Sequence, residues 1–143
     1  MYLLDTNVVS ELRKNRPHGA VLAWLHDVKD SDLHLSAVTL GEIQVGIEQM
    51  RQQDTRKAAA IEAWADLVAS TYNVLPIDAV TFRLWAKLMR GKSQTVYEDA
   101  LIAASALAHN RNFTVVTRNV RDFACFPVKL FNPFSNEPSR ADG

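Results

Sequence analysis

The chain of 143 residues lacks the features that would mark a membrane or secreted protein. It contains a single cysteine, Cys125, which excludes an internal disulfide and fits a reducing cytoplasm. The N-terminus has no basic region followed by an apolar run, so we expect no signal peptide. No apolar run is long enough to span a bilayer. These absences predict a cytoplasmic protein that does not enter a membrane.

Net charge and glycine-rich motifs give equally little guidance. The 16 basic and 16 acidic residues balance, so net charge indicates no nucleic-acid partner, although a local basic patch would be enough for one. There is no Gly-rich phosphate loop and no G-x-S-x-G elbow. Cys125 lacks the Cys or His spacing of a zinc site, and we interpret it as a packing residue.

Strand-like and helix-like segments alternate along the chain. Apolar or β-branched runs predict strands at residues 2–4, 33–35, 73–77, 113–117 and 128–131. Periodic apolar patterns predict helices at residues 6–14, 20–28, 36–50, 55–72, 79–90 and 99–110, with a loop at 91–98 and a turn at 118–123. This order predicts an α/β fold, a three-layer α/β/α sandwich around a mainly parallel sheet. We expect one domain over residues 1–134 and a frayed polar tail over residues 135–143.

Acidic side chains follow the predicted strands. Asp5 comes directly after the first strand, Glu42 lies within two turns of the second, and Asp99 begins an apolar helix. Asn119 and Asp122 follow the fourth strand. The carboxyl ends of parallel strands lie at one edge of the sheet, which is where binding sites form. These positions can therefore meet at one place.

A cluster of carboxylates would suit a divalent metal. Ionised carboxylates repel one another, and a hard cation resolves that conflict. Mg²⁺ and Mn²⁺ prefer oxygen ligands. Such a site can polarise a phosphodiester and supply a hydroxide nucleophile. The acids therefore indicate metal-dependent chemistry at phosphate.

Each acid also has a plainer interpretation. Asp5 is typical of a turn or a helix cap, and Asp99 of a cap. Glu42 matches a capping box with Thr39, in the pattern S/T-x-x-E. Asp122 fits a solvated turn. The spacing shows only that the four acids can converge.

Four segments, taken in order, resemble the motifs of PIN-domain ribonucleases. They are LLDTNVVSEL, LSAVTLGEIQVGI, DALIAASALAH and VVTRNVRDFACFPVKLFNPF. The resemblance extends from Tyr2 to about Phe134 and points to the VapC and FitB-like toxins of bacterial type II toxin–antitoxin modules. It implies an α/β/α sandwich, cleavage of RNA that depends on Mg²⁺ or Mn²⁺, and inhibition by a cognate antitoxin encoded beside the toxin.

The resemblance also implies roles for individual residues. Asp5, Glu42 and Asp99 match the three core acids of the family. The fourth acidic position falls in TRNVRDF, where we favour Asp122 and keep Asn119 as a neutral ligand or water-holding group. Three of these acids, Asp5, Asp99 and Asp122, would hold the metal. Glu42 would be either a ligand or the group that orients and deprotonates the water.

Hydroxyl and basic residues complete the predicted site. Thr6, also a candidate cap of the first helix, and Thr117 match small hydroxyl residues that could orient a carboxylate or a water. Cations near the acidic edge could hold RNA phosphate, although they could equally be solvated surface residues. These cations are Arg13, Lys14, Arg16, Arg90, Lys92, Arg118 and Arg121. Of these, Arg13, Arg90 and Arg118 are our candidates for phosphate contacts.

The expected partners follow from apolar helices and from the resemblance. The helical faces at residues 20–28 and 58–68 carry more apolar surface than we expect one small core to need. We expect an antitoxin segment to lie across a groove between the early helices and to place an arginine among the acids. The resemblance further implies an RNA substrate, a small DNA-binding antitoxin, and a homodimer that assembles with it.

Other classes of protein stay open at this point. A haloacid-dehalogenase-type phosphatase requires D-x-D after its first strand, where this chain has Asp5, Thr6 and Asn7. A receiver domain requires an acceptor aspartate on a middle strand and a late lysine, and neither is evident. A non-enzymatic binding module has no need for converging carboxylates. Metal-dependent cleavage of RNA, tested against hydrolysis of a small chromogenic phosphate ester, discriminates among these classes.

Overall fold

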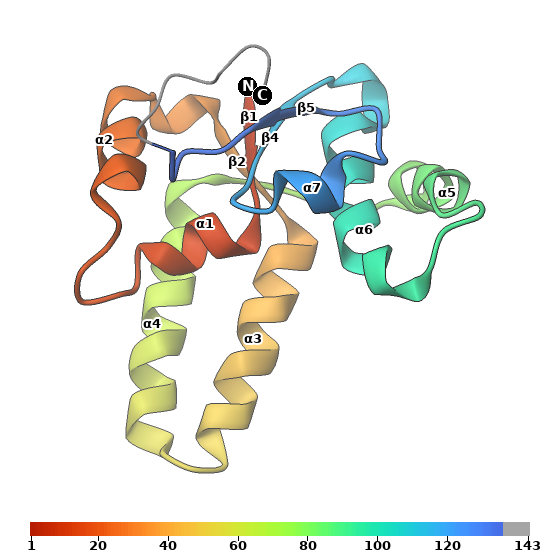
Figure 1. Cartoon of the computed structure of the whole chain (residues 1–143). Coiled ribbons are helices and arrows are strands. Elements are labelled where there is room, and N and C mark those ends of the chain that lie inside the picture. Colours follow the sequence, from red (N-terminus) through yellow and green to blue (C-terminus); the bar gives the residue numbers. More distant parts are fainter. Residues whose placement is uncertain (136–143) are drawn as a thin grey trace.

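The structure, a computed structural model, describes residues 1–135. These residues form five strands, seven α-helices and three short 3₁₀ helices, shown in Figure 1. The strands are β1 (Tyr2–Leu4), β2 (Leu33–Ser36), β3 (Asn73–Leu75), β4 (Thr114–Val116) and β5 (Lys129–Phe131). The α-helices are α1 (Thr6–Glu11), α2 (Gly19–Asp27), α3 (Ala37–Arg51), α4 (Thr55–Thr71), α5 (Ala79–Leu88), α6 (Tyr97–Leu107) and α7 (Val120–Phe123). The 3₁₀ helices are η1 (Asp30–Asp32), η2 (Gln94–Val96) and η3 (Ala108–Asn110). Apart from Ser135, the predicted tail lies outside the described residues.

The five strands form one sheet in the order β3-β2-β1-β4-β5. β1 lies at the centre, where Leu4 pairs with Leu35 of β2 and with Val116 of β4. Every pair of neighbours is parallel, and parallel neighbours need a crossover connection, so helices stand between successive strands. β3 lies at the edge and ends at Leu75, two residues earlier than predicted, because Pro76 cannot donate a hydrogen bond to a neighbouring strand. The predicted α/β/α sandwich is confirmed, with a sheet that is parallel throughout.

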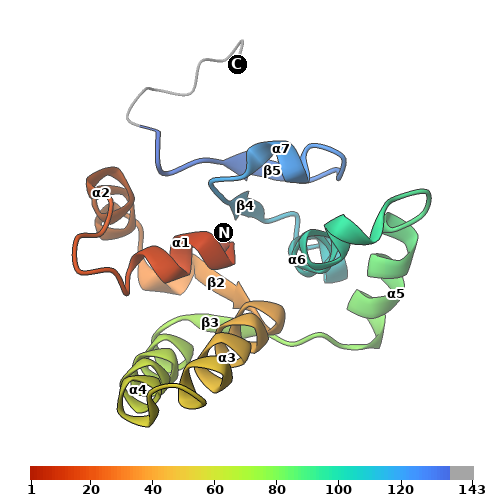
Figure 2. The same ribbon diagram turned by 60° about the horizontal axis from the view of Figure 1, so that its bottom comes forward.

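The two faces of the sheet are covered by different helices. Successive strand residues point to opposite faces. Leu4, Leu35 and Val116 form one core with residues of α1, α2 and α4. Leu3 and Val115 form a second core with residues of α6 and α7. Figure 2 shows the layers, with α1 and α2 on one side of the sheet and α5 and α6 on the other.

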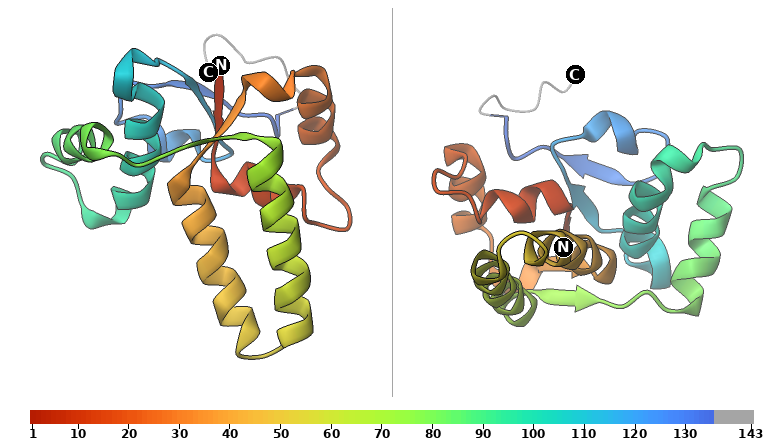
Figure 3. Two further views of the ribbon diagram at one scale, coloured as in Figure 1. Left: turned by 180° about the vertical axis from the view of Figure 1, so that it is seen from behind. Right: turned by 90° about the horizontal axis from the view of Figure 1, so that it is seen from below.

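The carboxyl ends of the strands share one edge of the sheet. Figure 3 (right) looks onto this edge, around which lie α1, α3, α6 and α7. The helices α3 and α4 form a hairpin that projects beyond the edge in Figure 1. Ile47, Ala58 and Ala65 are buried between these two helices. The hairpin therefore forms a wall beside the edge at which the predicted acids lie.

The start of two helices differs from the sequence prediction. The cap of α1 is Asp5, whose carboxylate accepts a hydrogen bond from the N–H of Thr6, so Thr6 is the first helical residue and not the cap. The helix α6 begins at Tyr97, so Asp99 lies in its first turn and does not cap it. The predicted loop at 91–98 is shorter, because η2 occupies part of it.

The predicted capping box of α3 is absent. The cap of α3 is Ser36, whose hydroxyl accepts a hydrogen bond from the N–H of Val38. The helix therefore begins before Thr39, which is buried inside the fold, and Glu42 lies in its second turn. The capping-box interpretation of Glu42 is wrong, because a better-placed hydroxyl precedes the helix.

The interpretation of Cys125 as a packing residue is also wrong. Cys125 is exposed. Phe123 and Phe126, which lie on either side of it in the sequence, are the residues that enter the core. Phe123 is the last residue of α7, and the turn after it leaves Cys125 outside while Phe126 returns to the core.

None of the helices in the part of the chain that the structure describes is long and apolar enough to cross a membrane.

Candidate functional site

Asp5 is the buried corner of the site. It directly follows β1, and it is only 6% exposed. Its Oδ2 accepts hydrogen bonds from the Thr117 hydroxyl at 2.8 Å and from the Asn7 amide at 3.2 Å. Its Oδ1 accepts a hydrogen bond from the N–H of Thr6 at 2.8 Å. Burial raises the pKa of Asp5 above its ordinary value, although these hydrogen bonds oppose the rise.

The loop after β4 supports this corner. Thr117 is fully buried, and its hydroxyl accepts a hydrogen bond from the N–H of Asn119 at 3.0 Å while it donates to Asp5. The N–H of Arg118 donates to the Asn7 side-chain oxygen at 3.3 Å. Side chains therefore join the ends of β1 and β4, which already pair in the sheet. Because every donor comes from one of these two strand ends, the orientation of the Asp5 carboxylate is set by the fold.

Glu42 lies on the neighbouring wall of the site. It is half-buried in the second turn of α3. Burial first, and then the charges of Glu98 and Asp5, raise the pKa of Glu42 to about 7 against the opposing effect of the Thr6 hydroxyl. The Thr6 hydroxyl has a single proton, for which the Thr39 hydroxyl at 3.3 Å competes with Glu42. A carboxyl group with a pKa near neutrality can take up or release a proton at physiological pH.

Asp99 and Asp122 complete the group. Asp99 is half-buried in the first turn of α6, and Asp122 is exposed on α7. Burial, and then the charges of Asp5, Asp122 and Glu98, raise the pKa of Asp99 to about 6. The charge of Asp122 also raises the pKa of Asp5. These mutual effects mean that the structure brings the four predicted acids into one electrostatic group.

Glu98 is an acid of this group that sequence reasoning missed. It is exposed, and it directly precedes Asp99 in α6. Its charge raises the pKa of both Glu42 and Asp99. The sequence predicts a loop at Glu98, because the helix start that it predicts lies two residues after the observed one. The sequence feature that indicates the earlier helix start is the acidic pair Glu98 and Asp99 before an apolar run, because acids are favoured in the first turn of a helix.

The chemistry of these side chains fits a hard divalent cation, since all of them are carboxylates. Within residues 1–135, no basic side chain forms an ion pair with any of the four predicted acids. In the same residues, no three His, Cys, Asp or Glu side chains stand as a ready-made ligand group for one metal ion. Glu98 and Asp122 are exposed, so their side chains can change rotamer at low cost. The site thus combines one fixed carboxylate with adjustable ones.

The two candidates for the fourth position differ in what they contribute. The charge of Asp122 acts on Asp5 and Asp99. The contribution of Asn119 is a backbone hydrogen bond to Thr117. Both residues are exposed and line the same shallow surface after β4. Asp122 is therefore the candidate that adds a charge to the site, while Asn119 supports Thr117 and, through it, Asp5.

The three arginines proposed for phosphate contacts lie in different places. The Arg118 guanidinium lies over the Phe134 ring, 4.6 Å from its centroid, beside the surface that carries Asp122. Arg13 lines a groove that ends at Glu42. Arg90 follows α5, and no ion pair within residues 1–135 joins it to an acid. Of the three, Arg118 therefore lies beside Asp122, whereas Arg13 shares a groove with Glu42.

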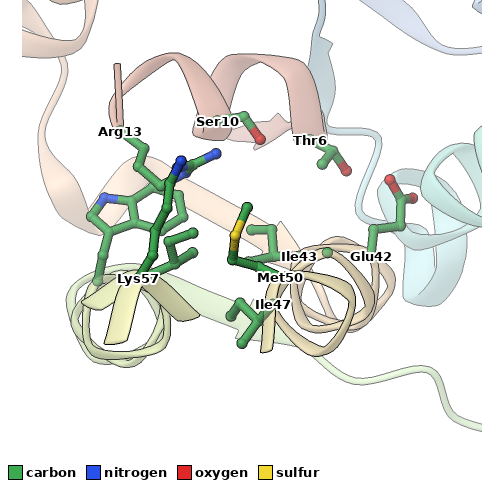
Figure 4. Close-up of a pocket in the computed structure, with 11 residues that line it drawn as sticks. Thr6, Ser10, Arg13, Glu42, Ile43, Ile47, Met50 and Lys57 are labelled. Atoms are coloured by element: carbon green, nitrogen blue, oxygen red, sulfur yellow. The ribbon is translucent and has the colours of Figure 1, made fainter. Parts of the chain in front are cut away.

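A groove runs from the acids between α1 and the α3–α4 hairpin, and Figure 4 shows it. It encloses about 310 Å³. Its lining residues are Thr6, Ser10, Arg13, Glu42, Ile43, Gly46, Ile47, Met50, Lys57, Ile61 and Trp64. The apolar face predicted at residues 58–68 contributes to it through α4. The face at 20–28 does not, because Trp24, Leu25 and Val28 of this segment pack against the core.

This chain is a parallel α/β/α sandwich whose carboxylates gather at the carboxyl edge of the sheet. It therefore falls in the class of α/β proteins with an acidic site at that edge. The PIN domain family profile matches residues 2–126, which include all four predicted acids. The chain therefore belongs to the PIN domain family.

Individual relatives agree with this assignment. VapC ribonuclease Y4jK of Sinorhizobium fredii is 34% identical over 139 residues, which cover 94% of this chain and 98% of that protein. Toxin FitB of Neisseria gonorrhoeae is 31% identical over 142 residues, covering 94% and 99%. The crystal structure of FitAcB from Neisseria gonorrhoeae matches with a TM-score of 0.80 at 30% identity, covering 94% of this chain and 99% of that one. The predicted family resemblance is confirmed.

Proposed function

We propose that this PIN-domain protein is a divalent-metal-dependent endoribonuclease. The observation that carries the proposal is the group of carboxylates around buried Asp5, which raise one another's pKa and have no basic partner within residues 1–135. Such a group favours a bound cation over mutual repulsion. The similarity to a VapC ribonuclease supports RNA as the substrate.

We assign different roles to the acids: some would bind the cation, and Glu42 would act on the attacking water. Asp5, Asp99 and Asp122 would hold Mg²⁺ or Mn²⁺. When bound, the cation supplies Lewis acidity towards the phosphate and the attacking water. Thr117 and Asn7 keep the Asp5 carboxylate pointing to the edge of the sheet through their hydrogen bonds. The exposed acids can then adjust around that one fixed ligand.

Glu42 is suited to accept the proton of the attacking water. Its pKa of about 7 leaves a large fraction ionised at neutral pH, while its basicity exceeds that of an ordinary carboxylate. Thr6 lies beside it and can orient the water through its hydroxyl. Direct ligation of the cation by Glu42 is the alternative. Measured at several Mg²⁺ concentrations, pH–rate profiles separate the two. A ligating carboxylate has its pKa lowered as the cation binds, so the acidic limb moves with metal concentration, whereas the limb of a general base persists at saturating metal.

We further propose that the protein acts in the cytoplasm as the toxin of a type II toxin–antitoxin module. The similarity to toxin FitB supports this role. We place a segment of the antitoxin in the groove beside α1, because its floor is apolar and one end is formed by Glu42. A basic side chain of the antitoxin would neutralise the acids there. The implied homodimer stays a prediction.

Two experiments test these proposals. The purified protein should cleave a single-stranded RNA with Mg²⁺ or Mn²⁺, should be inactive with a chelator, and should not hydrolyse a small chromogenic phosphate ester. Ester hydrolysis without RNA cleavage would reassign the site to a phosphatase. Expression of the chain should arrest growth, and co-expression of the neighbouring gene should relieve the arrest. Growth without arrest from an RNA-cleaving protein would reject the toxin role alone.

A further inference from the structure

The groove beside α1 carries opposite charges at its two ends. Glu42 and Thr6 close it on the side of the acids, and Arg13 and Lys57 lie at the other end (Figure 4). The floor between the ends is apolar. Its side chains are Ile43, Ile47, Met50, Ile61 and Trp64. An occupant of this groove therefore meets a negative end, an apolar middle and a positive end.

The positive end consists of two cations without an acidic partner. Arg13 lies in the turn after α1 and Lys57 in the first turn of α4, yet both line this groove and a second pocket beside it. Within residues 1–135 neither side chain forms an ion pair. The neighbouring Lys14, by contrast, is paired with Glu11 at 2.8 Å. Two like charges beside an apolar floor attract an anionic group from outside the chain.

The distance between the negative and positive ends of the groove corresponds to about two turns of a partner helix. Thr6, Ser10 and Arg13 line the groove from one side at intervals of four and three residues. Thr6 and Ser10 lie on α1, which ends at Glu11, and Arg13 stands in the turn that follows; a helix would cover a span of seven residues in roughly 10 Å. A partner helix places residues seven positions apart on one face at about the same separation. Residues three and four positions along that helix would then lie over the apolar floor.

We propose that this groove selects its partner by charge at both ends. An acidic side chain of the partner binds between Arg13 and Lys57, apolar side chains cover the floor, and a basic side chain faces Glu42. The occupant is a helical segment of the antitoxin that carries its acid and its base seven positions apart on one face. This inference rests on the proposed toxin role, to which it adds the acidic anchor and the direction of the segment.

A peptide fits this groove better than RNA. Four of the five floor side chains are aliphatic and offer no flat surface on which a base could stack. A phosphate backbone would need cations along its whole path, whereas the groove has them at one end only. Amphipathic helices, in contrast, bind apolar grooves through residues at this spacing.

Charge reversal tests the positive end. The probe is the purified product of the neighbouring gene, titrated into the purified full-length chain. The double variant Arg13→Glu and Lys57→Glu should weaken the complex by about 100-fold, since the partner acid would face two like charges. The matched control, Arg16→Glu with Arg56→Glu, changes the net charge equally at exposed sites that do not line the groove. It should change the affinity by less than about threefold.

A complementation experiment then identifies the partner residue. Each acidic residue of the partner is changed in turn to lysine and tested against the Arg13→Glu and Lys57→Glu variant. One such change should restore most of the lost affinity, and a basic residue should stand seven positions from it. Equal weakening by the test and control variants would overturn the inference, and so would the absence of any restoring change.

Two further outcomes separate this inference from the proposed function. If the wild-type chain forms no complex with the neighbouring gene product, the antitoxin role fails and the inference fails with it, while RNA cleavage is unaffected. If the complex withstands charge reversal but the KM for RNA rises, the two cations bind RNA. That result would reject the inference and leave the toxin role intact.

Discussion

The acids at the sheet edge fall into two unlike sets. Asp5 is 6% exposed and accepts three hydrogen bonds. Asp99 is half-buried and Asp122 exposed, and within residues 1–135 the carboxylates of both accept no hydrogen bond. The first carboxylate is held by the fold, whereas the others can move. A bound cation would therefore have one rigid ligand, Asp5, and other carboxylate ligands that can adjust when the substrate binds.

This difference has a physical origin in the sheet. Asp5 lies at the end of the central strand, where neighbours on both sides exclude water. A carboxylate buried there is stable only if donors replace the lost water, and Thr117 and Asn7 supply them. Asp122 lies on a short helix after β4 and stays in contact with solvent. It needs no such donors, so nothing fixes its orientation.

The largest expected effect comes from removing the fixed corner. Asp5→Asn should lower RNA cleavage by about 1,000-fold or more, because it removes a charge that no other buried residue supplies. Circular dichroism should show an unchanged fold. The control Asp66→Asn changes an exposed aspartate on α4 and should retain full activity. Full activity of Asp5→Asn after carry-over metal has been removed would contradict the mechanism.

The adjustable set offers the next test. Asp122→Asn should reduce kcat/KM by about 10- to 100-fold, because other exposed carboxylates can partly take its place. Asn119→Ala should have a smaller effect, since the backbone N–H that bonds Thr117 is retained. Cleavage assays across a range of Mg²⁺ concentrations measure both. The opposite ranking would identify Asn119 as the fourth site position.

Loosening the corner without removing its charge should have a smaller effect. Thr117→Val deletes the buried hydroxyl that donates to Asp5. We expect about a 10-fold loss of activity and about 1–2 kcal/mol of stability. Thr117→Ser, which keeps the hydroxyl, should restore most of both. Thr114→Val, in the strand β4 that precedes Thr117, is the control. Equal activity of the Val and Ser variants would show that the hydrogen bond is not needed.

The smallest effect is a dependence of stability on pH in the presence of a chelator. In the folded protein the pKa of Glu42 is about 7 and that of Asp99 about 6, above the values of 4.5 and 3.8 for free side chains. Between these values the folded chain binds more protons than the unfolded chain, so stability falls as pH rises from about 4 to 7. Because both groups are half exposed, we expect the Tm to fall by only a few degrees.

Thermal unfolding at several pH values measures this slope. Glu42→Gln with Asp99→Asn should flatten it, since both titrating groups are then neutral. Added Mg²⁺ should raise the Tm most at the upper end of the range, where more carboxylates are ionised and ready to bind it. A Tm that rises with pH across the same range in the chelator would show that the two carboxyl groups are not destabilised by ionisation.

Much of the fold followed from local patterns. Short β-branched runs and periodic helices identified every strand and the main helices, and their alternation predicted the parallel sandwich. Helix starts were less predictable. Ser36 and Asp5 cap their helices in place of Thr39 and Thr6, because several residues of similar capping preference stand close together. The start of α6 decided whether Glu98 belongs to the site, and local preference placed it too late.

The sequence by itself determined the kind of chemistry available, since it places an acid after each of three strands and repeats the order of motifs of a PIN domain. Only the tertiary structure decided how unequal those acids are. Burial and hydrogen bonding depend on neighbours such as Thr117, which lies 112 positions from Asp5 in the chain. The groove also depends on the tertiary structure. Arg13 and Lys57 lie at one end of it because α1 crosses the α3–α4 hairpin. The order and spacing of residues in the sequence show which side chains are available. Desolvation and charge pairing, in contrast, arise only between segments that folding brings together.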